Sequence, residues 1–320
     1  MRGVTAQKVL ERLKKGCASG EEMARELGIS RAAVWKAVKT LRSKGYEIVG
    51  GSSRGYALKE CRPPSARTVT RAAGTGTPVF LFSVADSTND TALELLKEGC
   101  PHLTAVAANS QRAGRGRVGR KFFSPPGTGI YMSVVIRGIE SYPDLLTLTP
   151  AAAVAAARAI KDVFGIEVKI KWVNDLYLDG KKVCGILTQS LTAAGGGILG
   201  AVVGIGINVT GEMPEELQRK ARSLKSSVSE EERDALIGKI IAELALVAKQ
   251  LSTREFMDEY RKLSCVIGEH ITFEKDGITY FGTAENIDND GALYVRVNNS
   301  SNSNNNNVIK LNTGEVSIIL

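Results

Sequence analysis

The chain has few of the residues from which disulfide frameworks and metal centres are built. Its 320 residues include only two histidines and five cysteines. The cysteines are odd in number, scattered and nowhere arranged as C-x-x-C, so neither a disulfide framework nor a structural zinc site is expected. With only His102 and His270 available, a metal centre built on histidine is not expected either.

Long apolar runs are also missing. No stretch approaches the roughly 20 apolar residues that a transmembrane helix requires. The first ten residues carry Arg2 and Lys8 but no apolar signal core. We therefore expect a cytoplasmic protein with no membrane partner. Hydrophobic residues still make up 43% of the chain, enough for a real core, and the length suggests two or three domains.

The positive charge is confined to one end of the chain. Residues 1–63 hold 14 Lys and Arg against 6 Asp and Glu, whereas residues 64–320 hold 28 of each kind. The whole formal excess of +8 therefore lies in the first fifth of the sequence. A small basic domain before a large neutral one predicts nucleic acid as the partner of the first and different chemistry in the second.

The basic segment has the local signals of a winged helix-turn-helix. Ser19 is followed three residues later by a glutamate, the spacing of a capping box, and the helix that it starts should end at Gly28. Ser30 can cap a second helix over residues 31–44, and residues 46–58 suit a hairpin that would form the wing. The alternative is a small helical bundle with a solvated basic face.

DNA contacts are predicted for the second helix and the wing. Lys and Arg would bind phosphates, and the first turns of the helix would meet the bases. The predicted contacts are Ser30, Arg31, Ala32, Trp35, Lys36, Lys39 and Arg54. The segment 61–65 has the composition of a linker and closes this domain.

The most distinctive motif is a loop of alternating glycine and arginine at residues 114–120. Glycine lets backbone N–H groups approach a ligand, and arginine supplies paired donors for carboxylate or phosphate. We expect the loop to cover an anionic ligand while it reacts. The alternative is an RNA-binding segment of the RGG type, which usually needs many repeats, whereas this chain has one copy between apolar flanks.

The order of strands and helices in the central segment predicts an α+β fold. Its Asp179-Gly180 pair marks a hairpin between two strands. Pro150 is expected to open an alanine-rich helix that ends at Gly165. The predicted strands, mostly an antiparallel meander, cover residues 80–84, 104–108, 130–136, 168–172, 182–187 and 198–209.

The last third of the chain changes from helices to short strands. Helices are predicted over residues 230–251 and 254–263 from their apolar period. From residue 266 onward, short strands separated by turns suit a small β-barrel. The tract 298–307 is almost entirely Asn and Ser, which favours a long hairpin loop.

Polar residues gather at two places in the central segment. Ser87, Thr88 and Asn89 stand at a strand-to-helix junction, where they can cap the helix or bind a polar head group. The second group lies on or beside one hairpin: Lys171, Asn174, Asp175 and Lys182. Each of its lysines alone is usually a surface residue. Together the group can hold Mg²⁺ beside phosphates and offset charge on a reacting phosphorus.

Other familiar phosphate and nucleophile motifs are absent. Gly204-x-Gly206 is too short for a dinucleotide fingerprint, and the chain has no G-x-x-x-x-G-K-[ST]. The site is therefore expected to be neither a Rossmann site nor a P-loop. Cys184 is expected to be a small buried hydrophobe, because no histidine lies near it in the sequence.

The glycine–arginine loop and three later segments resemble the biotin–protein ligase family. Those segments are residues 171–176, 182–187 and 204–209. Residues 30–36 resemble the bifunctional bacterial form, which is also the biotin operon repressor. The resemblance implies a winged helix at 1–63, a ligase domain with a mixed or antiparallel sheet of class II synthetase type at 64–265, and an SH3-like barrel at 266–320.

The resemblance also implies a two-step reaction. The biotin carboxylate attacks the α-phosphorus of Mg·ATP, and a lysine amine of a biotin carboxyl carrier domain then attacks the resulting biotinyl-5′-AMP. By similarity the biotin site contains Ser87, Thr88, Asn89, Gln111, Arg115, Gly116, Arg117 and Lys182, of which Arg117 and Lys182 are catalytic. The nucleotide site contains Arg117, Arg120, Asn174, Asp175 and Asn208, and Asp175 would bind Mg²⁺.

Two positions depart from the family pattern. Gln189 stands where glutamate is more usual, and Phe122 occupies a place often held by tryptophan. The family also implies a homodimer on operator DNA when the adenylate is bound, with repression of biotin synthesis genes. Two alternatives remain at this point: a biotin-sensing regulator without catalysis, and a lipoate-type acyl-adenylate ligase.

Overall fold

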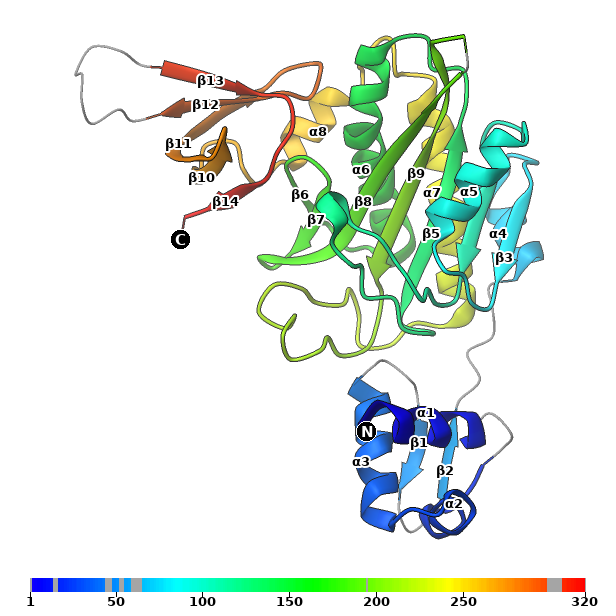
Figure 1. Ribbon diagram of the computed structural model, residues 1–320. Helices are drawn as coiled ribbons and strands as arrows, with labels where there is room; N and C mark the ends of the chain where they lie inside the picture. The colour runs from blue at the N-terminus through cyan, green and yellow to red at the C-terminus, as the bar shows by residue number, and fades with distance from the viewer. Residues whose placement is uncertain are drawn as a thin grey trace.

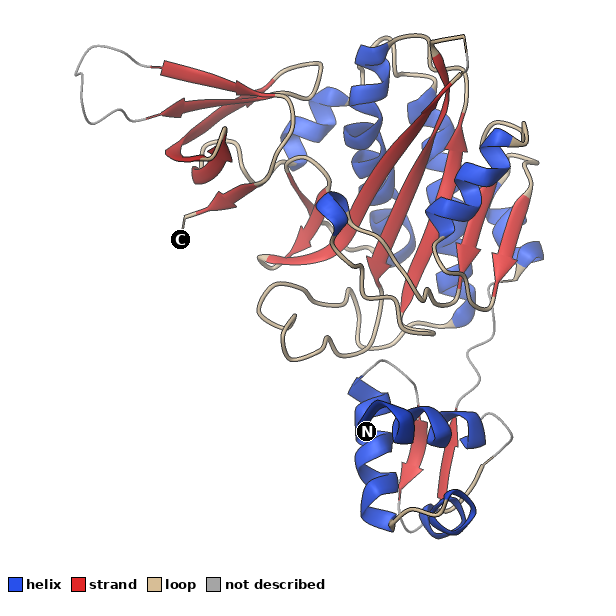
Figure 2. Ribbon diagram, in the orientation of Figure 1, coloured by secondary structure: helices blue, strands red, loops and turns tan. Residues whose placement is uncertain are grey.

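The computed structural model describes residues 2–13, 17–43, 48–51, 55–58, 65–193, 195–297 and 307–319. Within these ranges the strands form a two-stranded hairpin, a seven-stranded mixed sheet and a five-stranded antiparallel sheet. Figure 1 and Figure 2 show helices on both faces of the seven-stranded sheet. The predicted α+β class is confirmed.

The N-terminal unit consists of three helices and a hairpin; the second and third helices and the hairpin were predicted, and the first helix was not. These are α1 (Arg2–Leu13), α2 (Gly20–Leu27), α3 (Arg31–Ser43), β1 (Ile48–Gly51) and β2 (Gly55–Leu58). The capping box forms, because Glu22 N donates to Ser19 Oγ over 3.0 Å and Ser19 N donates to the Glu22 carboxylate over 2.8 Å. Gly28 has the left-handed φ of 64° that lets the chain leave α2.

This unit has an apolar core of its own. Its buried side chains come from the helices and the hairpin, and all lie between residues 6 and 58. Arg42 of α3 donates from its guanidinium to the backbone oxygens of Ile48 and Gly50. Arg42 therefore fastens the hairpin to α3.

The seven-stranded sheet has the strand order β3-β4-β5-β9-β8-β7-β6. Its strands are β3 (Val79–Phe82), β4 (Ala105–Ala108), β5 (Gly129–Ile136), β6 (Lys169–Lys171), β7 (Asp175–Leu178), β8 (Lys181–Thr192) and β9 (Ile198–Asn208). Among the described pairs, β3–β4 is parallel and the other five are antiparallel. Asp179 and Gly180 have φ angles of 48° and 73° and form the predicted turn between β7 and β8.

The two faces of this sheet have different coverings. The helices α4 (Ala66–Ala73), α6 (Tyr142–Phe164), α7 (Glu230–Ala248) and α8 (Met257–Leu263) share one apolar cluster with the sheet, and α5 (Thr88–Lys97) packs on the opposite face (Figure 1). Successive side chains of a strand point to opposite faces. Met132 and Val134 of β5 therefore enter the helical core, while Ser133 between them faces α5.

Helix α6 begins eight residues before the position predicted from Pro150. Its N-cap is Ser141, whose Oγ accepts from Asp144 N over 3.2 Å, and a proline occupies the first turn. Pro150 lies buried inside the helix, against the turn at Gly291. The prediction was wrong because the serine cap with an aspartate three residues later is the stronger start signal. The predicted end at Gly165 is confirmed.

The C-terminal strands form an open sheet in the order β13-β12-β11-β10-β14. These strands are β10 (His270–Lys275), β11 (Ile278–Ile287), β12 (Leu293–Val297), β13 (Asn307–Leu311) and β14 (Val316–Ile318). The predicted barrel is not confirmed, because within the described residues no pairing joins β13 to β14. The Asn-rich tract lies outside the described residues except for Asn307, with which β13 begins.

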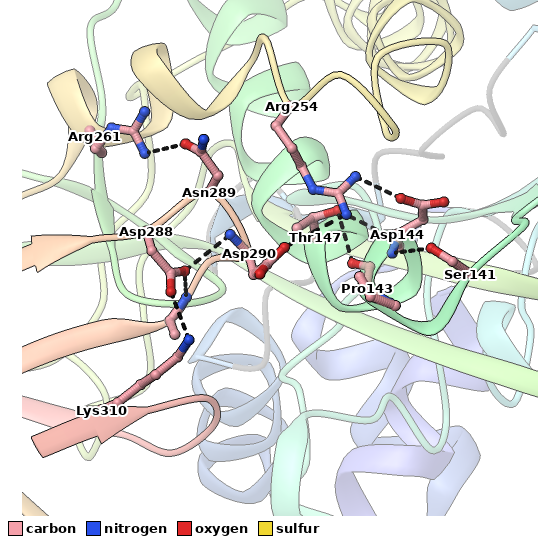
Figure 3. A network of polar contacts seen from close by, with 11 residues as sticks. Ser141, Pro143, Asp144, Thr147, Arg254, Arg261, Asp288, Asn289, Asp290 and Lys310 are labelled. Carbon is pink, nitrogen blue, oxygen red and sulfur yellow. Dashed lines mark hydrogen bonds and ion pairs between the residues drawn. The ribbon is translucent and has the colours of Figure 1, made fainter.

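The C-terminal sheet packs directly against the central unit. Ile271 and Phe273 belong to the same buried apolar cluster as α6 and α7. Trp172 donates its indole N–H to the backbone of the β11–β12 turn over 2.8 Å. Figure 3 shows the polar contacts beside this turn, where Arg254 pairs with Asp144 over 2.7 Å. The core of the molecule therefore continues across the change of sequence pattern at residue 266.

Candidate functional site

A cavity of about 460 Å³ lies on the α5 face of the seven-stranded sheet. The eight residues predicted for biotin all line it: Ser87, Thr88, Asn89, Gln111, Arg115, Gly116, Arg117 and Lys182. They come from the start of α5, the segment after β4 and the start of β8. Its mixture of apolar walls with a few polar groups is typical of a small-molecule site.

A larger cavity of about 1180 Å³ adjoins the first. The five residues predicted for the nucleotide all line it: Arg117, Arg120, Asn174, Asp175 and Asn208. Apolar side chains line it as well, among them Trp172, Met213 and Leu217. The sequence did not indicate that Glu315 and Ser317, on either side of a buried valine, would complete this wall from the C-terminal sheet.

Arg117 and Lys182 line both cavities and so stand where the two spaces meet. Arg117 donates to Asn174 Oδ1 over 2.8 Å. Lys182 Nζ lies 2.6 Å from Asp175 Oδ1, which also accepts from Asn174 Nδ2 over 3.0 Å. A carboxylate in the smaller cavity and a phosphate in the larger one would therefore approach the same two cations.

The glycine–arginine loop is held by ion pairs at both ends. Arg115 pairs with Asp90 of α5 over 2.9 Å, and Arg120 pairs with Glu315 over 2.8 Å. Between them Val118 is 84% exposed and has a positive φ of 53°. The pairs leave the loop between the two cavities, with its apolar tip in solvent.

The junction before α5 caps that helix and also lines the smaller cavity. Ser87 is the N-cap of α5, although the bond from Asp90 N to its Oγ is long at 3.5 Å. Gln111 Oε1 accepts from Thr88 N over 2.8 Å, so the helix start is tied to the segment after β4. Asn89 Nδ2 donates to Gln189 Oε1 over 2.8 Å. The capping residues therefore also form a wall of the smaller cavity.

The glycines of β9 have a packing role. A Cβ at Gly204 would lie 2.0 Å from Asn89 Oδ1, and a Cβ at Gly206 would lie 2.6 Å from the ring of Phe122. The site therefore rests on bare backbone at both positions. The short Gly-x-Gly motif gave no sign of this packing role in the sequence.

Burial explains the chemistry of two other groups near the cavities. Burial raises the pKa of the Cys184 thiol far above its usual range, in keeping with the inert hydrophobe predicted from the sequence. Burial first, and the charge of Asp175 second, raise the pKa of Tyr177 to about 12. Neither group is prepared to act as a nucleophile or base near neutral pH.

Six of the seven predicted DNA-binding residues lie at the start of α3 or within it. Ser30 caps α3 by accepting from Ala33 N over 3.1 Å. The side chains of Arg31, Lys36 and Lys39 are exposed, as is Ala32. Trp35 is 53% exposed, with Lys39 Nζ 5.5 Å from its ring centroid. Arg54 lies outside the described residues.

Protein side chains alone do not form a metal centre in the described part of the chain. No group of three or more His, Cys, Asp or Glu is suitably placed there. Asp175 faces the larger cavity as a single carboxylate, and Mg²⁺ is commonly held by one or two carboxylates together with substrate phosphates. In the same ranges, no helix combines the length and hydrophobicity needed to cross a bilayer.

Three family models match the chain. They are an HTH domain over residues 5–57, the biotin/lipoate A/B protein ligase family over residues 81–208, and the biotin protein ligase C terminal domain over residues 266–318. The three matches correspond to the N-terminal unit, the seven-stranded sheet and the C-terminal five-stranded sheet.

Curated relatives and a solved structure agree with these matches. The bifunctional ligase/repressor BirA of Bacillus subtilis is 32% identical over 291 residues, which is 88% of this chain and 89% of the relative. BirA of Escherichia coli is 32% identical over 87% of each chain. The biotin protein ligase of Aquifex aeolicus in complex with biotin and ATP is 25% identical with a TM-score of 0.62, over 76% of this chain and 98% of that one.

Proposed function

Because this chain belongs to the biotin–protein ligase family, in its bifunctional ligase–repressor form, we propose that it activates biotin with ATP and transfers it to a carrier lysine. The single observation that carries the proposal is the shared wall of the two cavities. Arg117 and Lys182 face both spaces, so one pair of cations can serve a carboxylate and a phosphate that must react together.

Adenylation brings two anions into contact, and the site supplies the charge that this requires. The biotin carboxylate attacks the α-phosphorus of ATP, and pyrophosphate leaves from the opposite side. Lys182 and Arg117 offset the negative charge that builds on the phosphoryl oxygens. Asn174, by accepting from Arg117 and donating to Asp175, holds that arginine and that carboxylate at a fixed spacing.

Asp175 is the residue that we propose for Mg²⁺. Its carboxylate lines the larger cavity beside Lys182, and the described residues contain no group of three or more His, Cys, Asp or Glu that could hold a metal ion. Phosphate oxygens of the nucleotide would supply further ligands. When bound, the ion offsets phosphate charge.

Transfer needs the mixed anhydride to be kept from water until the carrier arrives. The glycine–arginine loop stands beside both cavities and can cover the adenylate through Arg115, Gly116 and Arg117. The deprotonated amine of the carrier lysine then attacks the acyl carbon, an amide bond forms and AMP leaves. Arg120 and Asn208 would bind the nucleotide during both steps.

Pyrophosphate release tests the ligase proposal. Arg117→Ala and Lys182→Ala should each lower biotin-dependent pyrophosphate release, and transfer of labelled biotin to a carrier domain, by about 10²–10³-fold. The matched controls are Arg112→Ala and Lys181→Ala, neighbours of the same residue type that line neither cavity and should keep wild-type rates. Wild-type rates in the first pair would contradict the site assignment.

The same assays separate the alternatives. A sensor without catalysis would bind biotin without releasing pyrophosphate. A lipoate-type ligase would release pyrophosphate with lipoate, and lipoate would compete with biotin.

DNA binding is assigned to the N-terminal unit, with Ser30, Arg31, Ala32, Trp35, Lys36, Lys39 and Arg54 as the proposed contacts. Exposed cations on α3 support this assignment. Affinity for an operator should fall steeply with salt, because bound cations release counterions from DNA. Lys36→Ala and Lys39→Ala should each reduce the salt slope by about one.

The boundaries of the three units also belong to the proposal: 1–63 for DNA, 64–265 for catalysis and 266–320 for an SH3-like module. Formation of a homodimer on the operator when the adenylate is bound is proposed from family membership alone. Sedimentation of the full chain with and without biotinyl-AMP measures it directly.

A further inference from the structure

A fully buried hydroxyl lies behind the wall of the smaller cavity. Ser133 of β5 has no exposed surface, and nothing in the sequence singled it out. Its Oγ lies 2.6 Å from Asn89 Oδ1 and 2.8 Å from Thr88 Oγ1. Ser133 does not line the cavity, whereas Asn89 and Thr88 both do. The hydroxyl therefore reaches a bound ligand only through these two neighbours.

The amide of Asn89 can take only one orientation. Its Nδ2 donates to the backbone oxygen of Leu187 over 3.3 Å and to Gln189 Oε1 over 2.8 Å. A backbone oxygen only accepts, so turning the amide over would place two acceptors against each other. Asn89 Oδ1 must therefore face Ser133. Gly204 of β9, which pairs with Ser133 of β5, leaves room for this oxygen. A Cβ at Gly204 would lie 2.0 Å from Asn89 Oδ1.

The protons of the two hydroxyls can now be assigned. Ser133 has one proton, and Asn89 Oδ1 can only accept, so Ser133 donates to Asn89. The 2.8 Å contact between Ser133 and Thr88 then uses the proton of Thr88. The other acceptor within reach of Thr88 is Gln111 Oε1 at 3.2 Å, which is also a protein atom. With either acceptor the Thr88 proton stays inside the protein, and Thr88 Oγ1 offers the cavity lone pairs alone.

We propose that Ser133 is a positioning residue that makes the Thr88 hydroxyl an acceptor, so that this wall selects a ligand carrying an N–H donor. The proposal rests on the proposed function, because the cyclic urea of biotin carries two such donors. A dithiolane ring carries none and would leave Thr88 Oγ1 unpaired in a buried wall. A site with a committed polar group rejects a ligand that cannot pair with it far more strongly than an apolar pocket rejects an altered shape.

The test compares biotin with its two cyclic carbamate analogues, in which one ring N–H or the other is replaced by oxygen. This change preserves shape and replaces a donor with an acceptor. In the wild type, the carbamate whose oxygen meets Thr88 should have a biotin-site KM at least about 100-fold above that of biotin. The other carbamate serves as the internal reference for the altered electronic character of the ring.

Ser133→Ala removes the nearer acceptor, at 2.8 Å, and leaves the Thr88 hydroxyl only the longer 3.2 Å contact with Gln111 Oε1 inside the protein. The Thr88 hydroxyl can then turn from Gln111 and donate to the carbamate oxygen. The KM ratio between that carbamate and biotin should fall by about tenfold, while the KM for ATP and the kcat at saturating biotin stay within about twofold. Asn89→Ala is the second variant and leaves Ser133 in place. It removes the acceptor for the Ser133 proton, so Ser133 can donate to Thr88 and the same fall in the ratio is expected. Thr104→Ala removes a fully buried hydroxyl that lines neither cavity and should leave the ratio unchanged.

The results distinguish failure of the role proposed for Ser133 from failure of the proposed function. If the wild type is active and both Ser133→Ala and Asn89→Ala keep the wild-type KM ratio, the role of Ser133 is overturned and the proposed function is unaffected. If Ser133→Ala raises the KM for biotin and for ATP and lowers kcat to the same extent, while the KM ratio stays unchanged, Ser133 has a general packing role. This result would also overturn the proposed positioning role. A wild type that releases no pyrophosphate with biotin would instead refute the proposed function. If Ser133→Ala does not fold, Asn89→Ala decides by the same ratio.

Discussion

The two ends of this chain are attached to the central sheet in opposite ways. The N-terminal unit buries its apolar side chains within itself, between residues 6 and 58. The C-terminal sheet shares one apolar cluster with α6 and α7. Both ends match family models of similar length. A separate sequence module is therefore not always a separate folding unit, and the position of its buried residues decides which it is.

The polar contacts at the two ends differ in the same way. Where the described chain resumes at residue 65, Ser65 N donates to Asp234 of α7 over 2.9 Å. At the other end, the Arg254–Asp144 pair (Figure 3) and the Arg120–Glu315 pair lie on the central side of the C-terminal sheet. Arg120 also lines the larger cavity, so the C-terminal sheet contributes directly to the site.

The largest effects should come from two truncations that remove one end of the chain each. A chain lacking residues 1–63 should keep wild-type pyrophosphate release and lose retention on operator DNA. A chain lacking residues 266–320 should fail to give a folded catalytic unit, because Ile271, Phe273 and their neighbours would leave the shared core open. Circular dichroism and activity measure both outcomes. An active, cooperatively folded second truncation would contradict the shared core.

Removing one partner of the buried ion pair should have the next largest effect. Arg254 and Asp144 each have a side-chain exposure of 12%. Arg254→Ala leaves the carboxylate buried without its partner, and we expect a loss of about 3 kcal/mol in the free energy of unfolding. Calorimetry of the full chain should show this loss in the transition of the central and C-terminal units, with the transition of the N-terminal unit unmoved. Arg112→Ala, which breaks an exposed pair, is the control.

Acid should weaken the same ion pair. The hydrogen bond from Arg254 is the main reason why the pKa of Asp144 lies below its usual 3.8, with burial opposing it. A carboxyl with a lowered pKa contributes its full stability above the usual value, and this contribution is lost as the pH falls through the folded-state pKa. Asp144→Asn should therefore flatten the fall of the unfolding midpoint below about pH 4. An unchanged slope would remove Asp144 from the acid response.

The smallest effect should come from the cap of α2. Ser19→Ala removes the oxygen that accepts from Glu22 N and should cost about 1 kcal/mol. If the two cores are separate, only the unfolding transition of the N-terminal unit should shift. Ligase activity should stay at the wild-type level. A shift of both transitions would show that the two cores are coupled.

The sequence predicted those features that depend on neighbouring residues. The capping box at Ser19, the exit at Gly28 and the Asp179-Gly180 turn are all present, because a cap or tight turn is decided within a few residues. The start of α6 could have been found at Ser141 by the same rule, and the more conspicuous Pro150 concealed it. The residues that the family resemblance implied for the biotin and nucleotide sites also line the two cavities.

The features that were missed depend on contacts between distant residues. Ser133 looks like any residue of an apolar strand until β5 is placed beneath α5. Glu315 meets Arg120 across 195 positions of sequence, which no local pattern can indicate. The open five-stranded sheet and the strand β13 likewise depend on pairing, and a sequence rich in Asn and Ser does not predict where pairing resumes.

The bare backbone at Gly204 and Gly206 limits how this enzyme can be re-engineered. Because any larger residue at these positions would displace Asn89 or Phe122, changes in β9 would disturb residues that line the smaller cavity. Variants meant to accept a bulkier biotin analogue should therefore be sought in the glycine–arginine loop, where Arg115 and Val118 are already exposed to solvent. Libraries that randomise β9 should return mainly inactive clones.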